Sequence, residues 1–266
     1  KKVSLRKQWL KNFNRNNLIE YKPGVNVSFS DFIDKDLIYF SSLDIDRSIP
    51  SMIDGLKPSQ RMILFACMKK GRNAPESKVA QLGGYVSENT DYHHGEESLH
   101  KAIIGMAQNF TGSNNINLLK PSGNFGYRKL GGKEHASPRY IFTCLENVTN
   151  FIFRSEDDEI LEYKYDGSKR VEPKYYLPII PMALINGAAG IGTGFSTTIL
   201  PHNPKEVIQN LKKLMNDKPP KEMMPWFNGF TGTIDKDDKD DCKYHIRGKY
   251  TVNQNVVHIS EIPIIN

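Results

Sequence analysis

The chain has 266 residues, a formal net charge of +6, a pI near 9.0 and a mean hydropathy of −0.51. This composition excludes a membrane-spanning helix, because the longest apolar stretch, residues 177–185, is short and contains two prolines. Its 3 widely separated cysteines exclude a disulfide framework and a cysteine metal cluster, and they favour a reducing, intracellular setting.

The positive charge is concentrated near the N-terminus and favours a polyanionic partner such as nucleic acid. Acidic residues gather late, in residues 235–241, so we expect the earlier part of the chain to face the polyanion. The chain begins without Met in a basic, helix-like run, and we expect it to be a piece of a longer protein. The early cations are Lys1, Lys2, Arg6, Lys7, Lys11 and Arg15.

The first half of the sequence predicts a row of short helices. Apolar residues at helical spacing predict a helix over residues 1–16, and Ser30-Asp31 predicts a capped helix over 31–41. A turn-rich loop over residues 46–61 then leads into a third helix. Further helices are predicted over 77–85 and 96–110, followed by a glycine-rich hairpin over 118–132. This order resembles a helix-turn-helix with a wing.

Tyr140 follows a Gly-Gly pair and a predicted Ser-Pro helix start, directly after Arg139. A tyrosine hydroxyl is a poor nucleophile at neutral pH, because its pKa is about 10. A helix dipole and a neighbouring guanidinium would both favour the phenolate and would hold a phosphodiester nearby. The predicted helix packs through Ile141, Leu145, Val148 and Ile152, with Tyr140 at the edge of that stripe. The alternative is an ordinary surface tyrosine.

The second half of the sequence predicts more strands and turns than the first half. A strand and turn are expected at 163–167, and Asn203-Pro204 predicts a helix whose inward residues include Leu214 and Met215. Strands are predicted at 232–234, 244–246 and 256–259, with the acidic run as a solvated loop between the first two. A second α/β domain therefore begins near residues 160–175.

Ten short motifs in a fixed order resemble the DNA breakage-reunion region of type IIA DNA topoisomerases. The resemblance covers nearly the whole chain and is greater to the single-chain eukaryotic and large-DNA-virus branch than to the bacterial gyrase branch. The motifs are Arg-Ser-Ile-Pro (47–50), Asp-Gly-Leu-Lys-Pro (54–58), Tyr-His-His-Gly-Glu (92–96), Gln-Asn-Phe (108–110), Gly-Ser-Asn-Asn (112–115), Pro-Arg-Tyr (138–140), Glu-Pro (172–173), Pro-Ile-Ile-Pro-Met (178–182), Leu-Ile-Asn-Gly (184–187) and Gly-Ile-Gly-Thr-Gly (190–194).

The resemblance implies an α+β chain with three parts. Residues 1–28 would link to a Toprim domain outside the chain, residues 29–165 would form a winged-helix domain with the tyrosine, and residues 166–266 would begin a tower domain. The full enzyme would make a transient double-strand break and pass a second duplex through it, relaxing and decatenating DNA with ATP. The alternative is a winged-helix DNA-binding module without cleavage activity.

The resemblance also assigns chemical roles. Tyr140 matches the nucleophile that forms a 5′-phosphotyrosyl link and releases a 3′-hydroxyl. Arg139 and Arg47 match cations at the scissile phosphate, for which surface or salt-bridge roles are the alternatives. His94 matches a histidine that contacts the reacting phosphate. A metal site at the double histidine is discounted, because no third ligand has suitable spacing.

Further residues are expected to contact DNA. Ile191, between two glycines, matches a wedge that inserts between base pairs, and a buried core isoleucine is the alternative. The others would hold the DNA backbone, where their alternative is a solvated side chain: Lys57, Gln60, Arg61, His93, Lys78 and Lys133.

The cofactors implied by the resemblance are expected outside the chain. Neither the Glu-Gly-Asp-Ser and Asp-x-Asp-x-Asp motifs of a Toprim magnesium site nor an ATP-binding glycine motif occurs in the sequence. We therefore expect no metal site here, DNA binding without efficient cleavage by this chain alone, and a homodimer in the full enzyme, since two strands need two tyrosines. The location would be the nucleus in a cell, or the host cytoplasm or viral factory for a virus.

Overall fold

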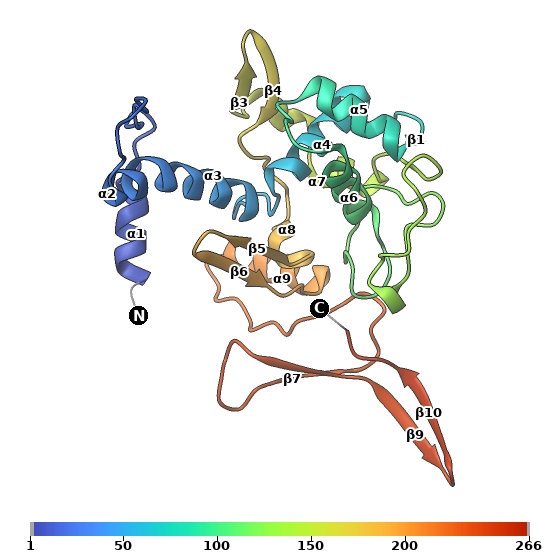
Figure 1. Cartoon of the computed structure of the whole chain (residues 1–266). Helices are drawn as coiled ribbons and strands as arrows, with labels where there is room; N and C mark the ends of the chain where they lie inside the picture. The colour runs from blue at the N-terminus through green and yellow to red at the C-terminus, as the bar shows by residue number, and fades with distance from the viewer. Residues whose placement is uncertain (1–2, 265–266) are drawn as a thin grey trace. The chain divides into compact units, whose positions relative to one another are not determined.

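The computed structural model describes residues 3–264 and divides the chain into two compact units. The first unit comprises the residues up to 50 together with 189–198, and the second comprises 51–188 and the residues from 199 onward. Both are built from short helices and two-stranded antiparallel sheets, which confirms the α+β class (Figure 1). The predicted linker, winged-helix and tower boundaries stay predictions.

One continuous helical segment dominates the first unit, beside α1 (Val3–Lys11). It comprises α2 (Phe29–Asp31), a π-helical stretch η1 (Phe32–Leu37) and α3 (Ile38–Ser48). The Ser28 hydroxyl accepts the Asp31 N–H at 3.0 Å and thereby caps the segment. The helix thus starts earlier than predicted and runs on to Ser48, which places Arg47 in a last helical turn where the sequence predicted a loop.

The hairpin of β5 (Ala188–Gly192) and β6 (Phe195–Ile199) carries the Gly-Ile-Gly motif, and its tip is fastened to α3. The Asp44 carboxylate accepts the backbone N–H of Thr193 at 2.7 Å and its hydroxyl at 2.8 Å. A Cβ atom at Gly190 would lie 2.2 Å from the Ser48 carbonyl oxygen, so only glycine fits there. The glycines of this motif therefore serve close packing of the hairpin against the helix.

The core of the second unit is formed by α4 (Pro58–Lys70), α5 (Val79–Asn89) and α6 (Glu96–Ala107). A short antiparallel sheet of β1 (Ser77–Lys78) and β2 (Phe142–Thr143) lies beside them, and the whole is consistent with a winged helix. The fully buried side chains of this core include Ile63, Leu64, Val79, Leu82, Leu99, Ile103, Ile104, Leu119, Ile141 and Ile152.

The predicted glycine-rich hairpin over 118–132 does not form. Instead, its first residues pair with the segment after Tyr140, through antiparallel bridges from Leu119 to Leu145 and from Ser122 to Phe142. The segment continues through the 3-10 turn η2 (Arg128–Leu130). Long-range pairing therefore replaces the local hairpin.

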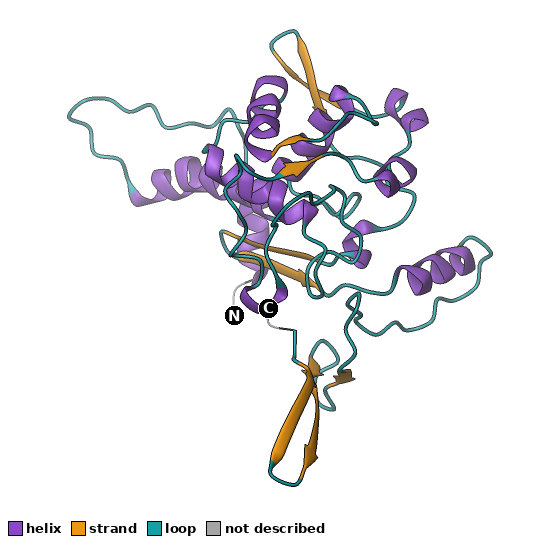
Figure 2. Ribbon diagram, turned by 90° about the vertical axis from the view of Figure 1, so that its right-hand side faces the viewer, coloured by secondary structure: helices purple, strands orange, loops and turns teal. Residues whose placement is uncertain are grey.

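The remaining elements largely agree with the sequence predictions. The Asn203 side chain caps α9 (Pro204–Leu214) at the predicted place, although Leu214 and Met215 are exposed rather than inward. The hairpin of β9 (Lys249–Asn253) and β10 (Val256–Glu261) has no further strand beside it within residues 3–264 (Figure 2). The other elements are α7 (Asn147–Ile152), η3 (Ser155–Glu159), β3 (Tyr163–Asp166), β4 (Lys169–Pro173), α8 (Met182–Ile185), β7 (Thr233–Lys236) and β8 (Tyr244–Arg247).

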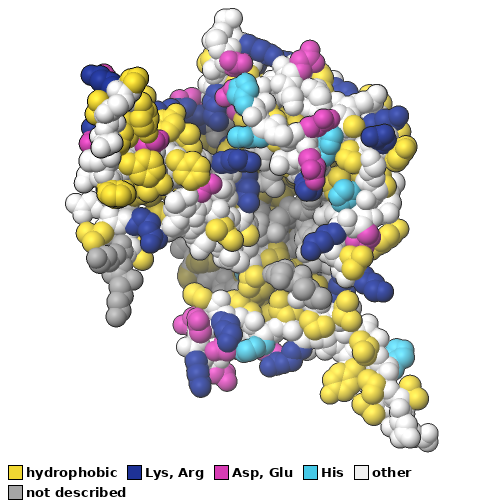
Figure 3. Space-filling model, in the orientation of Figure 1, with side chains coloured by type: hydrophobic (Ala, Val, Ile, Leu, Met, Phe, Trp, Pro, Cys, Tyr) yellow, Lys and Arg dark blue, Asp and Glu magenta, His cyan; other side chains and the backbone are white. Residues whose placement is uncertain are grey.

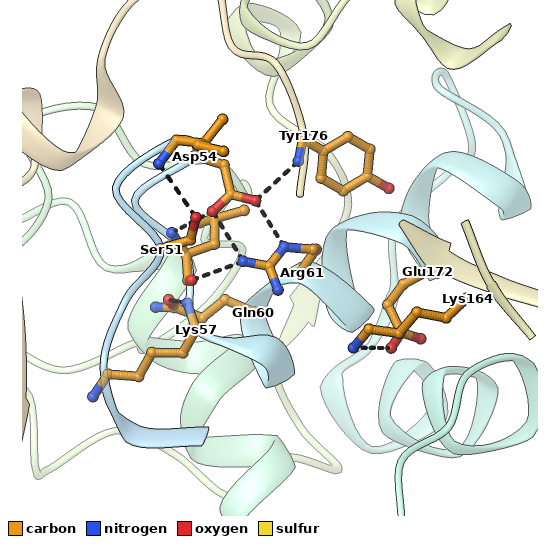
Figure 4. Close-up of polar contacts among 10 residues, drawn as sticks. Ser51, Asp54, Lys57, Gln60, Arg61, Lys164, Glu172 and Tyr176 are labelled. Carbon is orange, nitrogen blue, oxygen red and sulfur yellow. Dashed lines mark hydrogen bonds and ion pairs between the residues drawn. The ribbon is translucent and has the colours of Figure 1, made fainter. Parts of the chain in front are cut away.

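A buried ion pair between Asp54 and Arg61 ties three segments of this unit together (Figure 4). Asp54 is 0% exposed and Arg61 4% exposed, and the two nitrogen–oxygen distances are 2.7 and 3.0 Å. The same carboxylate accepts the backbone N–H groups of Leu56 and Tyr176, each at 3.0 Å. The pair therefore joins the loop before α4, α4 itself and the segment that follows β4.

Replacing Arg61 with Leu should destabilise the chain by about 3–5 kcal/mol, because it leaves the Asp54 carboxylate buried and without its counter-ion. Urea denaturation would measure the change in the free energy of unfolding. Lys101→Ala is the control, since its ion pair with Glu97 is exposed and such pairs contribute about 1 kcal/mol or less. An Arg61→Leu protein as stable as the control would contradict the structural role of the pair.

Candidate active site and nucleic-acid interface

Tyr140 lies in a tight turn and points into solvent. Its backbone N–H donates to the Ser137 carbonyl at 2.9 Å, and its side chain is 70% exposed. The next residue, Ile141, is 1% exposed and belongs to the core. The tyrosine is thus presented from the turn while its neighbour is held in the interior, as a reacting group requires.

The predicted helix start at Ser137-Pro138 is wrong, because α7 begins only at Asn147. Ile141 and Thr143 are buried while Phe142 between them is 37% exposed, which is the alternation of a strand. Pairing with residues 119–122 holds this segment extended. The dipole of a helix that begins at Ser137-Pro138 therefore does not act on Tyr140, whereas the first-turn N–H groups of α5 at Val79 and Ala80 donate to the Ile141 and Pro138 carbonyls on either side of it.

Arg139 is the nearest such cation in the sequence. Its side chain is exposed, and within residues 3–264 its guanidinium has neither a hydrogen-bond partner nor an ion pair. A guanidinium keeps its charge and offers two parallel N–H groups to phosphate oxygens. Arg139 is therefore free to bind an anion beside the Tyr140 hydroxyl.

Gln108 supports the loop that leads to Tyr140, a role that its sequence pattern did not indicate. Its side-chain amide donates to the carbonyls of Phe125 at 2.9 Å and Gly132 at 3.2 Å. Gly132 has a φ of +76°, and a Cβ there would lie 2.2 Å from the Gln108 amide nitrogen. The Gln-Asn-Phe motif at 108–110 thus fixes the loop against the end of α6.

A second anchor joins this loop to β10. Arg128 contacts the Glu261 carboxylate at 2.7 Å and donates to the Ile262 carbonyl at 2.6 Å. Glu261 also accepts the backbone N–H and the hydroxyl of Thr231, each at 2.9 Å. The backbone N–H of Thr231 lowers the pKa of Glu261 to about 2, and the Thr231 hydroxyl and Arg128 act in the same direction.

The two histidines of the Tyr-His-His-Gly motif are exposed in the connection between α5 and α6. The His93 Nε2 atom lies 2.6 Å from a carboxylate oxygen of Asp91. The His94 ring packs edge-on against the buried Tyr92 ring, with 5.5 Å between centroids. Both imidazoles therefore stand at the surface, with His94 held in place by an aromatic neighbour.

The structure corrects one predicted DNA contact at the start of α4. Arg61 is buried against Asp54, so its guanidinium is not available to DNA. Gln60 accepts the Lys57 N–H at 2.9 Å and acts as a helix cap, while the Lys57 ammonium points away from the buried pair (Figure 4). Lys78 and Lys133 are exposed, as an electrostatic contact to a phosphate requires.

Arg47 and Ile191 belong to the first unit and are described within it. Arg47 is exposed in the last turn of α3. Ile191 is 83% exposed on β5, although Gly190 beside it is buried, and this argues against the alternative of a core isoleucine. An apolar side chain held out from a fastened hairpin has the form that a wedge between base pairs needs.

The acidic run 235–241 is interspersed with cations, and Figure 3 shows both signs mixed at the β7–β8 hairpin. Lys236 pairs with Glu222 at 2.9 Å and with Asp241 at 3.0 Å, and Asp237 accepts from His245 at 2.8 Å. No group of three or more His, Cys, Asp and Glu side chains within 3–264 is placed to hold a metal ion. The described residues do not fit a magnesium site, so no chemical step is assigned to a metal here.

None of the helices over residues 3–264 is both long and apolar enough to cross a membrane.

Comparison with known proteins identifies the family. A family model that describes the A subunit of DNA gyrase/topoisomerase IV matches residues 47–266. The chain is 51% identical to DNA topoisomerase 2 of Arabidopsis thaliana over 99% of its own length and 18% of that protein. It is 46% identical to DNA topoisomerase 2 of Acanthamoeba polyphaga mimivirus over 97% of its own length and 20% of that protein.

A solved structure agrees with these sequence matches. The DNA-binding, cleavage and re-ligation domain of Plasmodium falciparum topoisomerase II is similar with a TM-score of 0.88 and 45% identity, over 99% of this chain and 36% of that one. The chain belongs to the DNA gyrase/topoisomerase IV family. Within that family it matches the breakage-reunion region of type II DNA topoisomerases, which confirms the resemblance seen in its motifs. It spans about a fifth of the length of the curated relatives, 18–20%.

Replacing Glu261 with Gln should make the free energy of unfolding less dependent on pH in the acidic range. The folded pKa of Glu261, about 2, lies below its ordinary value of 4.5, so its stabilising effect is present above pH 4.5 and is lost as the pH falls towards 2. The difference in unfolding free energy between wild type and Glu261→Gln should therefore shrink over that window. Denaturant titrations at several pH values would measure it, with the exposed Glu88→Gln as control, and a difference independent of pH would contradict the account.

Proposed function

We propose that this chain is the DNA-cleaving part of a type II DNA topoisomerase and that Tyr140 is its nucleophile. The observation that carries the proposal is the 70% exposed Tyr140 side chain, on a turn held by the buried Ile141 and directly after Arg139, which has no ion pair within residues 3–264. The relatives named DNA topoisomerase 2 support the same assignment.

The proposed reaction is a transesterification. The Tyr140 oxygen attacks a backbone phosphorus atom of DNA and forms a new phosphorus–oxygen bond as its proton is removed. The bond to the 3′ oxygen breaks, and that oxygen leaves with the electron pair, takes up a proton and becomes a free 3′-hydroxyl. The product is a 5′-phosphotyrosyl link, so the phosphodiester energy is kept and the reverse reaction reseals the strand.

Three further side chains would assist this step. Arg139 would neutralise charge on the phosphate oxygens as the pentacoordinate transition state forms. Arg47 would supply a second cation to the same phosphate, and its exposed position at the end of α3 leaves its guanidinium accessible. His94 would donate a hydrogen bond to the phosphate or carry the proton released by Tyr140.

Other residues would hold and bend the DNA. Lys57, Lys78 and Lys133, together with His93 and Gln60, would contact the backbone, which gives affinity and salt sensitivity without sequence specificity. Ile191 would insert between base pairs and bend the duplex. Fluorescence energy transfer across an end-labelled duplex tests the wedge, since Ile191→Ala should reduce the bend, and an unchanged bend would contradict it.

The activity of the whole protein is proposed on the same basis. A homodimer would place one tyrosine on each strand of a duplex and pass a second duplex through the break, with ATP and Mg²⁺ bound outside this chain. The relatives include eukaryotic and mimivirus proteins. The nucleus is therefore the proposed location for a cellular protein, and the host cytoplasm or viral factory for a viral one.

The test is covalent capture of DNA by the full-length protein. Incubation with supercoiled DNA and Mg²⁺, followed by denaturation, should give DNA attached to protein, and Tyr140→Phe should abolish the adduct because its side chain has no hydroxyl. Tyr127→Phe is the matched control, since Tyr127 is 64% exposed in the loop that precedes Tyr140. An adduct that persists in Tyr140→Phe would overturn the proposed function.

A further inference from the structure

A cavity of about 440 Å³ lies between α4, η3 and the β3–β4 hairpin, all within the second unit. Its size falls in the range of small-molecule sites, about 300–1,000 Å³. None of its lining residues is one to which the proposed cleavage reaction assigns a role. The cavity therefore needs an explanation of its own.

The walls of the cavity are strongly basic. Four cations line it, Lys69, Arg72, Lys169 and Arg170, against one carboxylate, Asp158. Among the cations that line it, Arg72 is the one paired with that carboxylate, at 3.3 Å, in the described part of the chain. Within residues 3–264, Lys69 and Arg170 have no ion pair. The cavity thus carries a formal charge of +3 (four cations less one carboxylate) and suits an anion with several acceptor oxygens.

Two of these cations are held over aromatic rings. The Arg170 guanidinium lies 4.3 Å from the centroid of the Tyr163 ring, and the Lys69 ammonium lies 5.9 Å from that of Phe65. A guanidinium stacked on one ring can accept a second planar group on its outer face. Arg170 therefore offers a stacking surface as well as a charge at the rim of the cavity.

Tyr176 adds a hydroxyl group to the wall of the cavity. Its side chain is only 4% exposed and lines the cavity, with its ring edge-on to Phe153 at 5.6 Å. Its backbone N–H is bonded to Asp54, yet its hydroxyl has no hydrogen-bond partner among residues 3–264. The hydroxyl oxygen itself is reached by solvent although the ring is buried, so it is available within the cavity to donate to a ligand.

We propose that this cavity binds a phosphate-bearing small molecule of about the size of a nucleoside monophosphate. Lys69, Arg72 and Arg170 would contact the phosphate oxygens, the Tyr176 hydroxyl would donate to one of them, and a planar base would stack on the outer face of Arg170. A DNA duplex is the less suitable ligand, because its wide surface would meet the exposed Lys169 and Arg170 at the rim rather than the buried Tyr176.

Calorimetric titration of the 266-residue chain with AMP, inorganic phosphate and adenosine tests the proposal. AMP and inorganic phosphate should bind at one site and compete, with AMP the tighter, while adenosine should bind far more weakly. Arg170→Ala, at an exposed position, should weaken AMP binding about tenfold or more. Tyr176→Phe should weaken it about three- to tenfold, because only a hydroxyl is lost.

Lys174→Ala is the control, since Lys174 is an exposed cation outside the cavity that pairs with Glu162, and it should leave AMP binding unchanged. Absence of saturable AMP binding at millimolar concentration would overturn the proposal. Equal weakening by Arg170→Ala and the control would do the same, as would displacement of AMP by duplex DNA, which would place the cavity in the DNA surface. None of these outcomes depends on Tyr140, so the site can fail while the proposed cleavage function stands.

Discussion

The buried carboxylate of Asp54 is a central constraint on the fold of the second unit. It binds the Arg61 guanidinium with two hydrogen bonds and accepts two backbone N–H groups from segments far apart in the sequence. A carboxylate with no solvent exposure would be strongly destabilising alone, so these donors have to be present together. Because all of these donors must lie within hydrogen-bond distance of one carboxylate, they fix the position of the loop before α4 relative to the segment that follows β4.

The hydrogen bonds to Asp54 also determine the positions of two other side chains, Lys57 and Tyr176. Because the loop after Asp54 turns back onto Arg61, Lys57 stands at the start of α4 with its ammonium directed away from the pair. Because the Tyr176 backbone is bound to the same carboxylate, the Tyr176 ring is fixed in the interior, where it lines the basic cavity. One buried ion pair therefore supports both the proposed DNA surface and the proposed anion site.

The sequence predicted some features because they depend on neighbouring residues. Asn203-Pro204 begins a helix through its own side chain, and the strand and turn predicted at 163–167 follow from the turn residues there. Other features depend on distant partners. Ile141 and Leu145 fit helical spacing, yet the bridges to Ser122 and Leu119 around them impose a strand, and nothing local to Tyr140 indicates this. Arg61 likewise resembles a surface cation until the burial of Asp54 is known.

In the candidate site too, some features could be predicted from neighbouring residues and others depend on distant partners. Its motif residues were found from their order in the sequence, and the exposure of Tyr140, Arg139 and Ile191 agrees with their expected roles. The predicted helix start beside Tyr140 was wrong, because α7 begins only at Asn147. Gln108 was missed, since its role arises from the fold of residues 125–132 against its amide. The proposed activation of the tyrosine draws on guanidinium and imidazole groups.

The most direct measurement of the central claim is identification of the residue that carries DNA. The full-length protein would be trapped on cleaved DNA by denaturation, digested with nuclease and protease, and analysed by mass spectrometry. The account predicts a nucleotide attached through its 5′ phosphate to Tyr140, in the peptide that also contains Arg139. A nucleotide on another residue, or attached through a 3′ phosphate, would contradict it.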